Sequence, residues 1–249
     1  MRSGRTRELL NRKLSEGEKL HFTLIDPDAS DIDFVKRVAA SMSAAGTDAF
    51  LIGGSTGVTP HEIDLVAKTL KESSDKPVII FPGNVNCLTP YADAVFFMVL
   101  MNSLEPYYLI EAQVQAAPIV KKYGLETIPL AYLVVYGDSA VAHVGRAYPL
   151  PPEKPELAVS YAMAAEMLGF EYLYLEAGSG AKQMVPTSFV RGIKKHTRLK
   201  LIVGGGIRSA EGVLSLLDAG ADIIVTGTLV EREPEEATKI VKTIKSWKH

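Results

Sequence analysis

The stretch "EYLYLEAGSG" (Glu171–Gly180) begins as a short apolar run and ends in a glycine-rich turn, with one acid, Glu176, between the two halves. A continuous apolar run of this length is typical of a strand that is buried on both faces, as in a parallel sheet. The glycines that follow allow the backbone to approach a phosphate group closely. The stretch therefore predicts a buried strand whose carboxyl end faces a binding site.

Further apolar runs of similar length complete a set of eight candidate strands. Patterns typical of helices separate them, and alternation repeated to eight strands predicts a (β/α)8 TIM barrel. A doubly wound open sheet is the alternative, which the strand count disfavours. Barrels of this kind contain about 250 residues, so we expect residues 1–249 to form a single domain. The runs are Leu20–Asp26, Ala49–Gly54, Pro77–Gly83, Ala94–Asn102, Thr127–Gly137, Tyr172–Gly178, Leu199–Gly206 and Asp222–Thr228.

Two intervals between the strands are irregular. The segment "NVNCLTPYAD" (84–93) is too short for a full helix and contains a proline, so we expect the third helix to be missing or replaced by an extended segment. Residues 137–155 are proline-rich and show no clear period, which is typical of a lid, a binding loop or a disordered segment. Elsewhere the helix signals are clear: Thr59, Pro60 and Glu62 form the pattern of a capping box.

Composition excludes several classes of protein. The net charge is -2 and the basic residues are dispersed, so we expect no nucleic-acid partner. Cys87 is the only cysteine, which excludes an intramolecular disulfide and a cysteine-rich metal site. The longest apolar stretches are too short to span a bilayer, and residues 1–20 lack the apolar core of a signal peptide. We therefore expect a soluble cytoplasmic protein, which can still contact a membrane surface peripherally or bind a lipid-like substrate.

Polar and glycine residues follow nearly every candidate strand, where a barrel carries its active site. Turn chemistry explains any single end, but the last three ends together predict a phosphate pocket. This pocket would be formed by the motifs "EAGSG" (176–180), "VGGGIRS" (203–209) and "VTGT" (225–228). Arg208 is either a partner of the phosphate or a solvent-facing residue at the start of a helix, and the sequence leaves both readings open.

A second group of polar residues follows the first two strands. Asp26 ends its strand, and Ser55 follows the next one, so both could serve a Mg²⁺ ion, which prefers oxygen ligands. We expect Asp28 or Ser30 to cap the helix that begins near Asp31, so Asp28 is not expected to bind metal. His143 is expected to be an ordinary loop histidine without a catalytic role.

Together these motifs resemble the geranylgeranylglyceryl phosphate synthase family, whose PcrB-type bacterial relatives make heptaprenylglyceryl phosphate. The resemblance extends from about Leu20 to Glu231 and rests on "LIDPD", "IGGST", "PGN", "YLEAGSG", "VGGGIRS" and "VTGT". It implies a modified barrel whose third helix is replaced. It also implies a Mg²⁺-dependent prenyltransferase that joins sn-glycerol 1-phosphate to a polyprenyl diphosphate through an ether bond, in archaeal membrane lipid biosynthesis.

The resemblance also implies roles for individual residues. Asp26 and Ser55 would hold the metal, and Glu176 would bind the glycerol hydroxyls or act as the general base. The C20 donor is expected in preference to C35, with an apolar channel for the chain, and the family implies a homo-oligomer, a dimer or hexamer. Tyr174 either donates a hydrogen bond to a hydroxyl or fills the barrel. The residues implied to bind sn-glycerol 1-phosphate are Tyr174, Leu175, Glu176, Ala177, Gly178, Ser179, Gly180, Gly205, Gly206, Gly227 and Thr228.

Two rival functions share parts of this pattern. A phosphosugar isomerase or lyase barrel of the histidine or tryptophan pathways would share the last two phosphate loops, but Glu176 beside the glycines argues against it. A barrel that keeps the phosphate pocket only as a binding or assembly module is the third hypothesis. The set of Asp26, Ser55 and Glu176 argues against that hypothesis.

Overall fold

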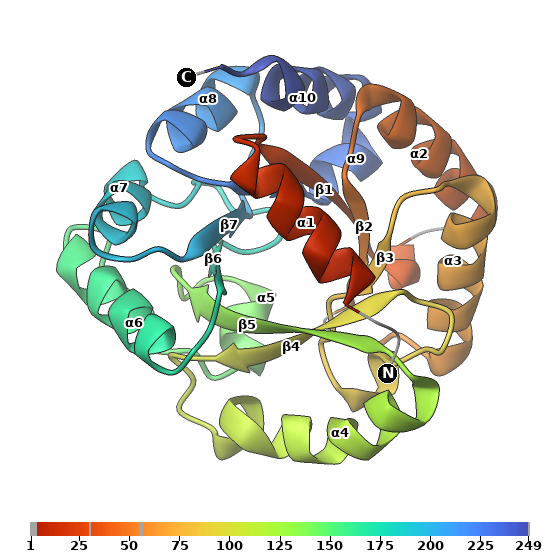
Figure 1. Ribbon diagram of the computed structural model, residues 1–249, viewed down its shortest axis with the longest axis horizontal. Coiled ribbons are helices and arrows are strands. Elements are labelled where there is room, and N and C mark those ends of the chain that lie inside the picture. The colour runs from red at the N-terminus through yellow and green to blue at the C-terminus, as the bar shows by residue number, and fades with distance from the viewer. Residues whose placement is uncertain (1–3, 30, 55–56, 249) are drawn as a thin grey trace.

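The computed structural model describes residues 4–29, 31–54 and 57–248. Its eight strands are parallel and form a closed barrel in the order β1 to β8, which confirms the predicted fold (Figure 1). The strands are β1 (Leu20–Ile25), β2 (Ala49–Ile52), β3 (Val78–Ile80), β4 (Ala94–Leu100), β5 (Glu126–Val134), β6 (Tyr172–Glu176), β7 (Lys200–Gly204) and β8 (Ile223–Thr226).

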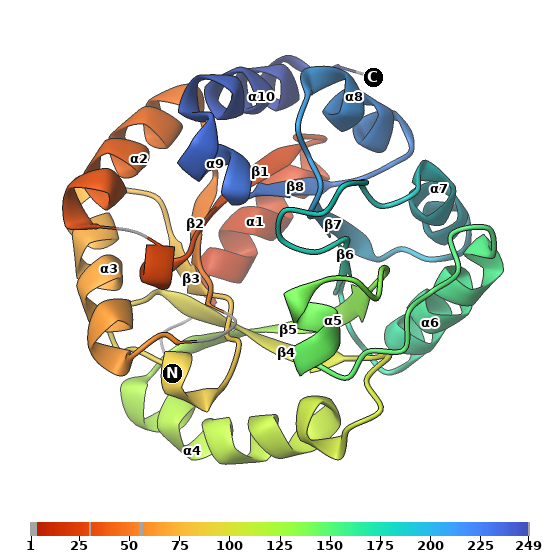
Figure 2. The ribbon, with the colours of Figure 1, turned by 180° about the vertical axis from the view of Figure 1, so that it is seen from behind.

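Helices surround the barrel and also lie across its two ends. Figure 1 shows α1 across one end, and the view from behind in Figure 2 shows α5 and α9 at the other. The α-helices are α1 (Arg5–Ser15), α2 (Ile32–Ala45), α3 (Pro60–Ser73), α4 (Ala112–Tyr123), α5 (Ala140–Val144), α6 (Pro155–Met167), α7 (Thr187–His196), α8 (Ala210–Asp218), α9 (Thr228–Arg232) and α10 (Pro234–Ser246). Two short 3₁₀ turns, η1 (Pro27–Ala29) and η2 (Val85–Cys87), and a π-helical turn, η3 (Tyr107–Glu111), complete the set.

Local hydrogen bonds explain where α2 and α3 begin. The Thr59 hydroxyl accepts a bond from the Glu62 N–H, and the Glu62 carboxylate accepts one from the Thr59 N–H, so the predicted capping box is confirmed. At α2 the prediction is wrong, because Asp31 is the N-cap and accepts a bond of 2.6 Å from the Phe34 N–H. Asp28 lies in η1, three residues too early to reach the first free N–H groups of α2.

The interval after β3 contains no full helix, as predicted. Only the short turn η2 forms there. β3 pairs with β4 at two positions, Ile79 with Ala94 and Ile80 with Val95. β4 pairs with β5 along its whole length, so the carboxyl half of β4 extends beyond its partner β3. This leaves an opening in the barrel wall between the carboxyl ends of β3 and β4.

Alternation along the strands divides the core into two layers. Side chains that point inward fill the barrel, among them Phe22, Leu51 and Phe96. Side chains that point outward pack beneath the surrounding helices, among them Phe50 and Leu175. The period of two in strand side chains produces this division.

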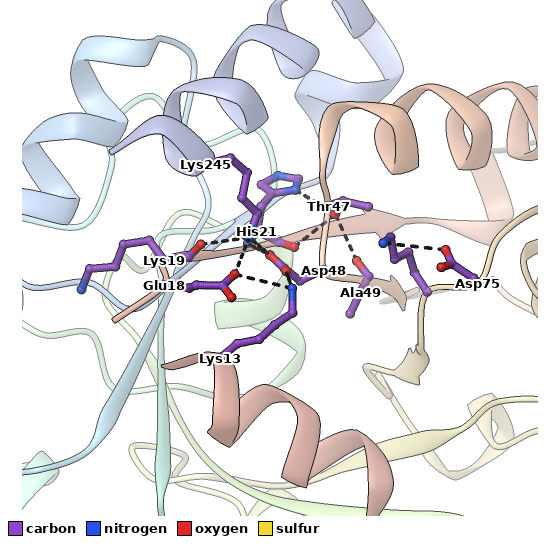
Figure 3. Close-up of polar contacts among 10 residues, drawn as sticks. Lys13, Glu18, Lys19, His21, Thr47, Asp48, Ala49, Asp75 and Lys245 are labelled. Atoms are coloured by element: carbon purple, nitrogen blue, oxygen red, sulfur yellow. Dashed lines mark hydrogen bonds and ion pairs between the residues drawn. The ribbon is translucent and has the colours of Figure 1, made fainter. Parts of the chain in front are cut away.

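Charged residues close the amino-terminal end of the barrel (Figure 3). The Asp48 carboxylate, which is 2% exposed, accepts bonds from Lys13 of α1 at 2.6 Å and from Lys245 of α10 at 2.5 Å. The Glu126 carboxylate accepts a bond of 2.9 Å from the backbone N–H of Thr6 in the first turn of α1. α1 is thereby held across this end, which leaves the opposite end for the active site.

A neutral histidine lies beside this network. The His21 ring nitrogens are each 2.9 Å from a hydroxyl oxygen, one of Thr47 and the other of Thr226. Complete burial lowers the pKa of His21 to about 3, so the ring stays uncharged. Two neutral hydroxyl partners suit that state.

The segment 137–155 differs from the expected irregular loop, because it contains the short helix α5. Ser139 caps this helix by accepting a bond of 3.2 Å from the Ala142 N–H, and five residues are too few to show a helical period in the sequence. The Asn102 amide donates bonds of 2.8 Å to the carbonyls of Val134 and Tyr148, which fixes the segment over the end of β4. Among the helices that the structure describes, none is long and apolar enough to cross a membrane.

Candidate active site

Two adjoining cavities lie at the carboxyl ends of the strands. The polar pocket, of about 240 Å³, is lined by the glycine-rich loops after β6, β7 and β8. The apolar cavity, of about 230 Å³, extends toward the opening between β3 and β4 and toward η3, α4 and α5. The residues that line both cavities are Leu24, Glu176, Ser179, Gly227 and Thr228. Glu176 therefore lies where a polar molecule and an apolar one could meet.

Close backbone approach shapes the polar pocket. Gly205 and Gly206 have φ angles of +83° and +68°, in the left-handed region that favours glycine. A Cβ atom on Gly206 would lie 2.2 Å from the carbonyl oxygen of Gln183, so a larger residue would collide with backbone. The hydroxyls of Ser179 and Thr228, which also line this pocket, lie 3.0 Å apart. Backbone amides and hydroxyls of this kind are typical of a phosphate site.

Glu176, at the end of β6, is the buried acid of the site. Its side chain is 6% exposed and accepts bonds from the Gly178 N–H at 2.6 Å and from the Tyr132 hydroxyl at 3.1 Å. Burial raises the pKa of Glu176, and the bonds from Gly178, Tyr132 and Tyr174 partly oppose that rise. A carboxylate with a raised pKa is a stronger proton acceptor at neutral pH, which suits a general base.

Aromatic rings surround this carboxylate. Tyr132 and Tyr174 are edge to face with centroids 5.2 Å apart, and Phe81 stacks on Tyr174 at 5.2 Å. Gly204 makes room for this arrangement, since a Cβ there would lie 2.0 Å from the Tyr174 hydroxyl. Sequence analysis left the role of Tyr174 open and missed Tyr132. The pairing of β5 with β6 places Tyr132 directly beside Tyr174, and no local motif indicates that contact.

Asp26 lines the apolar cavity, and its acidic neighbour there is Glu231. The half-buried carboxylate of Asp26 accepts a bond of 3.3 Å from the Asp28 N–H and forms no ion pair within the described residues. Burial raises the pKa of Asp26. Burial and the charge of Asp26 together raise the pKa of Glu231, a second carboxylate that lines the apolar cavity and that sequence analysis did not select. The charge of Arg232 opposes the rise in the pKa of Glu231, but neither carboxylate forms an ion pair in the described part of the chain, so the negative charge here favours a bound cation.

The predicted metal site is only partly described. Ser55 lies outside the described residues, and Asp28 is exposed. Among the described residues, no group of three or more His, Cys, Asp or Glu side chains could hold a metal ion by itself. A Mg²⁺ ion at Asp26 would therefore complete its shell with other oxygen atoms, as Mg²⁺ usually does with water and substrate phosphate.

The apolar cavity passes through the opening between β3 and β4, the two strands that no full helix connects. Its walls come from β4, from the segment around η2, from η3 and α4, and from α5. Representative lining residues are Phe81, Leu88, Phe96, Met98, Tyr108 and Val141. No full helix follows β3 to cover this side of the barrel, and the cavity lies at that place.

Not every residue in the predicted set lines a cavity. Leu175 and Ala177 are fully buried in the layer between barrel and helices, so only their backbone could contact a ligand. Gly178 donates its N–H to Glu176 and has a φ of +108°. His143 is exposed on α5 and lines neither cavity. The remaining predicted residues, Tyr174, Glu176, Ser179, Gly180, Gly205, Gly206, Gly227 and Thr228, line the polar pocket together.

Arg208 lines the polar pocket from the loop after β7. Its guanidinium donates bonds to the carbonyls of Ala181 at 3.1 Å and Gly180 at 3.4 Å. The side chain is exposed to solvent, as one of the two readings expected, and it is tied to the loop after β6. A contact between Arg208 and a phosphate stays a prediction.

This arrangement has close parallels among known proteins. The sequence pattern of the PcrB family matches residues 12–245. The chain belongs to the PcrB family. A protein of Staphylothermus marinus named geranylgeranylglyceryl phosphate synthase is 59% identical over 243 residues, which cover 97% of this chain and 99% of that protein. The resemblance drawn from the motifs is confirmed.

Solved structures agree with this assignment to the PcrB family. A crystal structure of (S)-3-O-geranylgeranylglyceryl phosphate synthase from Thermoplasma acidophilum, in complex with its substrate sn-glycerol-1-phosphate, is 41% identical with a TM-score of 0.92. The match covers 96% of this chain and 98% of that one. The tryptophan synthase α chain of Legionella pneumophila has a TM-score of 0.60 at 13% identity, with 97% and 96% of the chains covered, and shares the fold alone.

Proposed function

We propose that this chain is a geranylgeranylglyceryl phosphate synthase, which joins sn-glycerol 1-phosphate to geranylgeranyl diphosphate through an ether bond in archaeal membrane lipid biosynthesis. One observation carries the proposal: Glu176, a buried carboxylate with a raised pKa, lies where the polar pocket meets the apolar cavity. The named relatives and the Thermoplasma structure with sn-glycerol-1-phosphate support the same reaction.

The polar pocket would bind sn-glycerol 1-phosphate. The backbone N–H groups of the loops at Gly205 and Gly206, with those at Gly227 and Thr228, would receive the phosphate. Glu176 would accept hydrogen bonds from the glycerol hydroxyls at the other end of the molecule. The Glu176 carboxylate and the phosphate site can therefore lie in one pocket, because the substrate carries hydroxyls at one end and a phosphate at the other.

Glu176 would also move the proton. The terminal glycerol hydroxyl attacks the first carbon of the prenyl chain, a C–O bond forms, and the bond from that carbon to the diphosphate oxygen breaks. The hydroxyl proton passes to Glu176 and diphosphate leaves with the bonding electrons. Tyr132 would hold the carboxylate in place through its 3.1 Å bond. Burial of the carboxylate among aromatic rings would keep water away from the reacting carbon.

The residues around Asp26 fit a Mg²⁺ ion. Asp26 and Glu231 are carboxylates without an ion pair in the described part of the chain, and Asp26 with Ser55 is the ligand pair that the family resemblance implies. When bound, Mg²⁺ neutralises negative charge on the diphosphate as it leaves. Asp26 would fix the side of the cavity from which the diphosphate departs.

The apolar cavity would receive the prenyl chain. Its aromatic and aliphatic walls bury hydrocarbon, and its polar end lies at Asp26 and Glu176. The heptaprenyl (C35) donor of PcrB-type enzymes remains the alternative to the C20 donor. We also propose that residues 1–249 form one domain. The expected dimer or hexamer, the peripheral membrane contact and the cytoplasmic location stay predictions.

A transfer assay tests the proposal. Purified protein, Mg²⁺ and radiolabelled sn-glycerol 1-phosphate are mixed with the C20 or the C35 prenyl diphosphate, and label in the organic phase is counted. Transfer with C20 should fall by roughly 10²- to 10⁴-fold in Glu176→Gln, the usual effect of losing a general base. Glu156→Gln, an exposed position on α6, is the matched control and should retain full activity.

The metal assignment has its own readout. Titration calorimetry should detect weaker Mg²⁺ binding in Asp26→Asn, in the presence of inorganic diphosphate, than in the unaltered protein. Absence of transfer from both prenyl donors by folded protein would refute the prenyltransferase assignment. Transfer from C35 in preference to C20 would reassign the enzyme to the heptaprenyl class.

A further inference from the structure

Gln113 is an unusual residue in the wall of the apolar cavity. It lies in the first turn of α4, its side chain is 8% exposed, and it lines the cavity beside apolar residues. Its amide nitrogen donates bonds of 2.5 Å to the carbonyl of Met98 and 3.4 Å to the carbonyl of Tyr108. A single side chain therefore connects strand β4 to the π-helical turn η3.

The topology explains why Met98 needs such a donor. β4 pairs with β3 only as far as Val95, and Met98 lies three residues further along the strand. A strand that extends beyond its partner leaves backbone groups unpaired, and buried unpaired groups are costly. Gln113 supplies the donor from α4, at the same opening through which the apolar cavity passes.

The π-helical turn needs a similar support. In η3 the Ala112 N–H donates to the Tyr107 carbonyl, the wide spacing that distinguishes a π turn from an α-helix. Such turns are rare and are found frequently at functional sites. Tyr107 and Tyr108 line the apolar cavity from this turn, so its position decides where their rings stand.

The other end of the Gln113 amide has no partner. Its carbonyl oxygen is buried and, within the described residues, it is the one buried side-chain polar atom without a hydrogen bond. A buried acceptor without a donor destabilises the fold, and a hydrocarbon side chain of similar size would remove that penalty. The Gln113 oxygen thus has an energetic cost, and the two bonds that its amide nitrogen makes are the structural gain that accompanies it.

We propose that Gln113 is a positioning residue for the prenyl substrate: its amide fastens η3 to the open edge of β4 and so sets the wall of the apolar cavity. The proposal rests on the proposed function, because the cavity is taken to receive the prenyl chain. It goes further in that it assigns prenyl binding to a polar side chain outside every motif of the family resemblance. Gln113 acts through Met98 and through the turn that carries Tyr108.

The matched variants are Gln113→Met and Gln115→Met. Methionine has nearly the shape of glutamine and fills irregular gaps, so it removes both bonds with little change in volume. Gln115 is exposed on the same helix and serves as the control for the substitution itself. Thermal unfolding of each variant establishes that it folds.

The first readout does not depend on activity. Hydrogen exchange of the backbone amides in residues 104–112 should accelerate about tenfold in Gln113→Met, roughly the effect of losing one hydrogen bond, and should not change in Gln115→Met. Unchanged exchange in Gln113→Met would overturn the proposal, because the amide would then not hold the turn.

The second readout separates positioning from general damage. KM for geranylgeranyl diphosphate should rise about tenfold in Gln113→Met, while kcat and KM for sn-glycerol 1-phosphate stay within about twofold. If kcat falls and both KM values rise together, the role of Gln113 is purely structural and the proposal is overturned. If the unaltered protein transfers neither C20 nor C35 chains, the proposed function fails, and hydrogen exchange still decides whether Gln113 holds η3.

Discussion

Replacing Tyr132 with phenylalanine tests how the site controls its buried acid. The substitution deletes one oxygen atom and with it the 3.1 Å bond to Glu176 Oε2, while the ring keeps its contacts with Phe81 and Tyr174. A hydrogen bond to a charged group contributes about 1.5–3 kcal/mol. Each 1.36 kcal/mol changes an equilibrium or a rate about tenfold, so the ionised form of Glu176 should become at least about tenfold less favoured.

The direction of the pH effect follows from the charge that Tyr132 stabilises. Burial already raises the pKa of Glu176, and the Tyr132 hydroxyl opposes that rise. Without the hydroxyl the pKa rises further, so more of the enzyme carries a protonated Glu176 that cannot accept a proton. The acid limb of kcat/KM should move to higher pH, and activity below that limb should fall about tenfold or more.

The assay is the transfer of label from sn-glycerol 1-phosphate, measured across pH with saturating prenyl donor. Tyr136→Phe is the matched control, because its hydroxyl donates to the Met184 carbonyl at 2.9 Å and not to Glu176. The control should keep the pH profile of the unaltered enzyme. An unshifted acid limb in Tyr132→Phe, or an equal shift in both variants, would refute the role assigned to Tyr132.

Four further changes have expected outcomes that calorimetry, denaturation or kinetics can check. Glu176→Gln should unfold at a higher temperature than the unaltered protein, with a margin that grows as pH rises above 4.5, because the unfolded chain loses this proton there while burial keeps the folded carboxyl protonated to higher pH; an equal margin at all pH values would contradict this. Gly206→Ala should raise KM for sn-glycerol 1-phosphate, since its Cβ would lie 2.2 Å from the Gln183 carbonyl, and an unchanged KM would show that the loop relaxes freely. Asp48→Asn should lower the free energy of unfolding by about 1.5–3 kcal/mol in urea titrations, because Lys13 and Lys245 lose their buried carboxylate partner and keep only their longer ion pairs with Glu18, while kcat is unaffected in the remaining folded protein. In the unaltered protein, the free energy of unfolding should fall by up to about 1.4 kcal/mol per pH unit as pH drops from 6.5 to about 3, because only the unfolded chain protonates His21 there. His21→Gln should remove this part of the pH dependence.

Several features of the fold follow from local sequence. The continuous apolar runs that end at Asp26, Gly178 and Gly206 predict buried parallel strands, and the structure places strands there. The short interval 84–93 predicts the absence of a third helix, since backbone length alone limits what it can form. Glycines in "EAGSG" and "VGGGIRS" indicate the polar pocket, because close approach and left-handed φ angles require them at particular positions.

Other features depend on contacts between residues that are distant in the chain. Tyr132 reaches Glu176 through the pairing of β5 with β6, and the charge of Asp26 raises the pKa of Glu231 only because β8 closes the barrel onto β1. The N-cap of α2 is Asp31 and not Asp28, because Asp28 lies in the turn η1, and the loop conformation decides which of the two acids caps the helix.

The division between the two kinds of feature has a physical cause. Apolar periodicity and glycine placement reflect local backbone requirements, so the sequence by itself determined the barrel, its missing helix and the acid beside the phosphate loops. The partners of that acid, the opening beside β4 and the support that Gln113 gives to η3 depend on strand register and on which backbone groups lack partners. Strand register and the set of unpaired backbone groups are defined only when the strands have paired into the closed barrel, so the tertiary structure alone decided them.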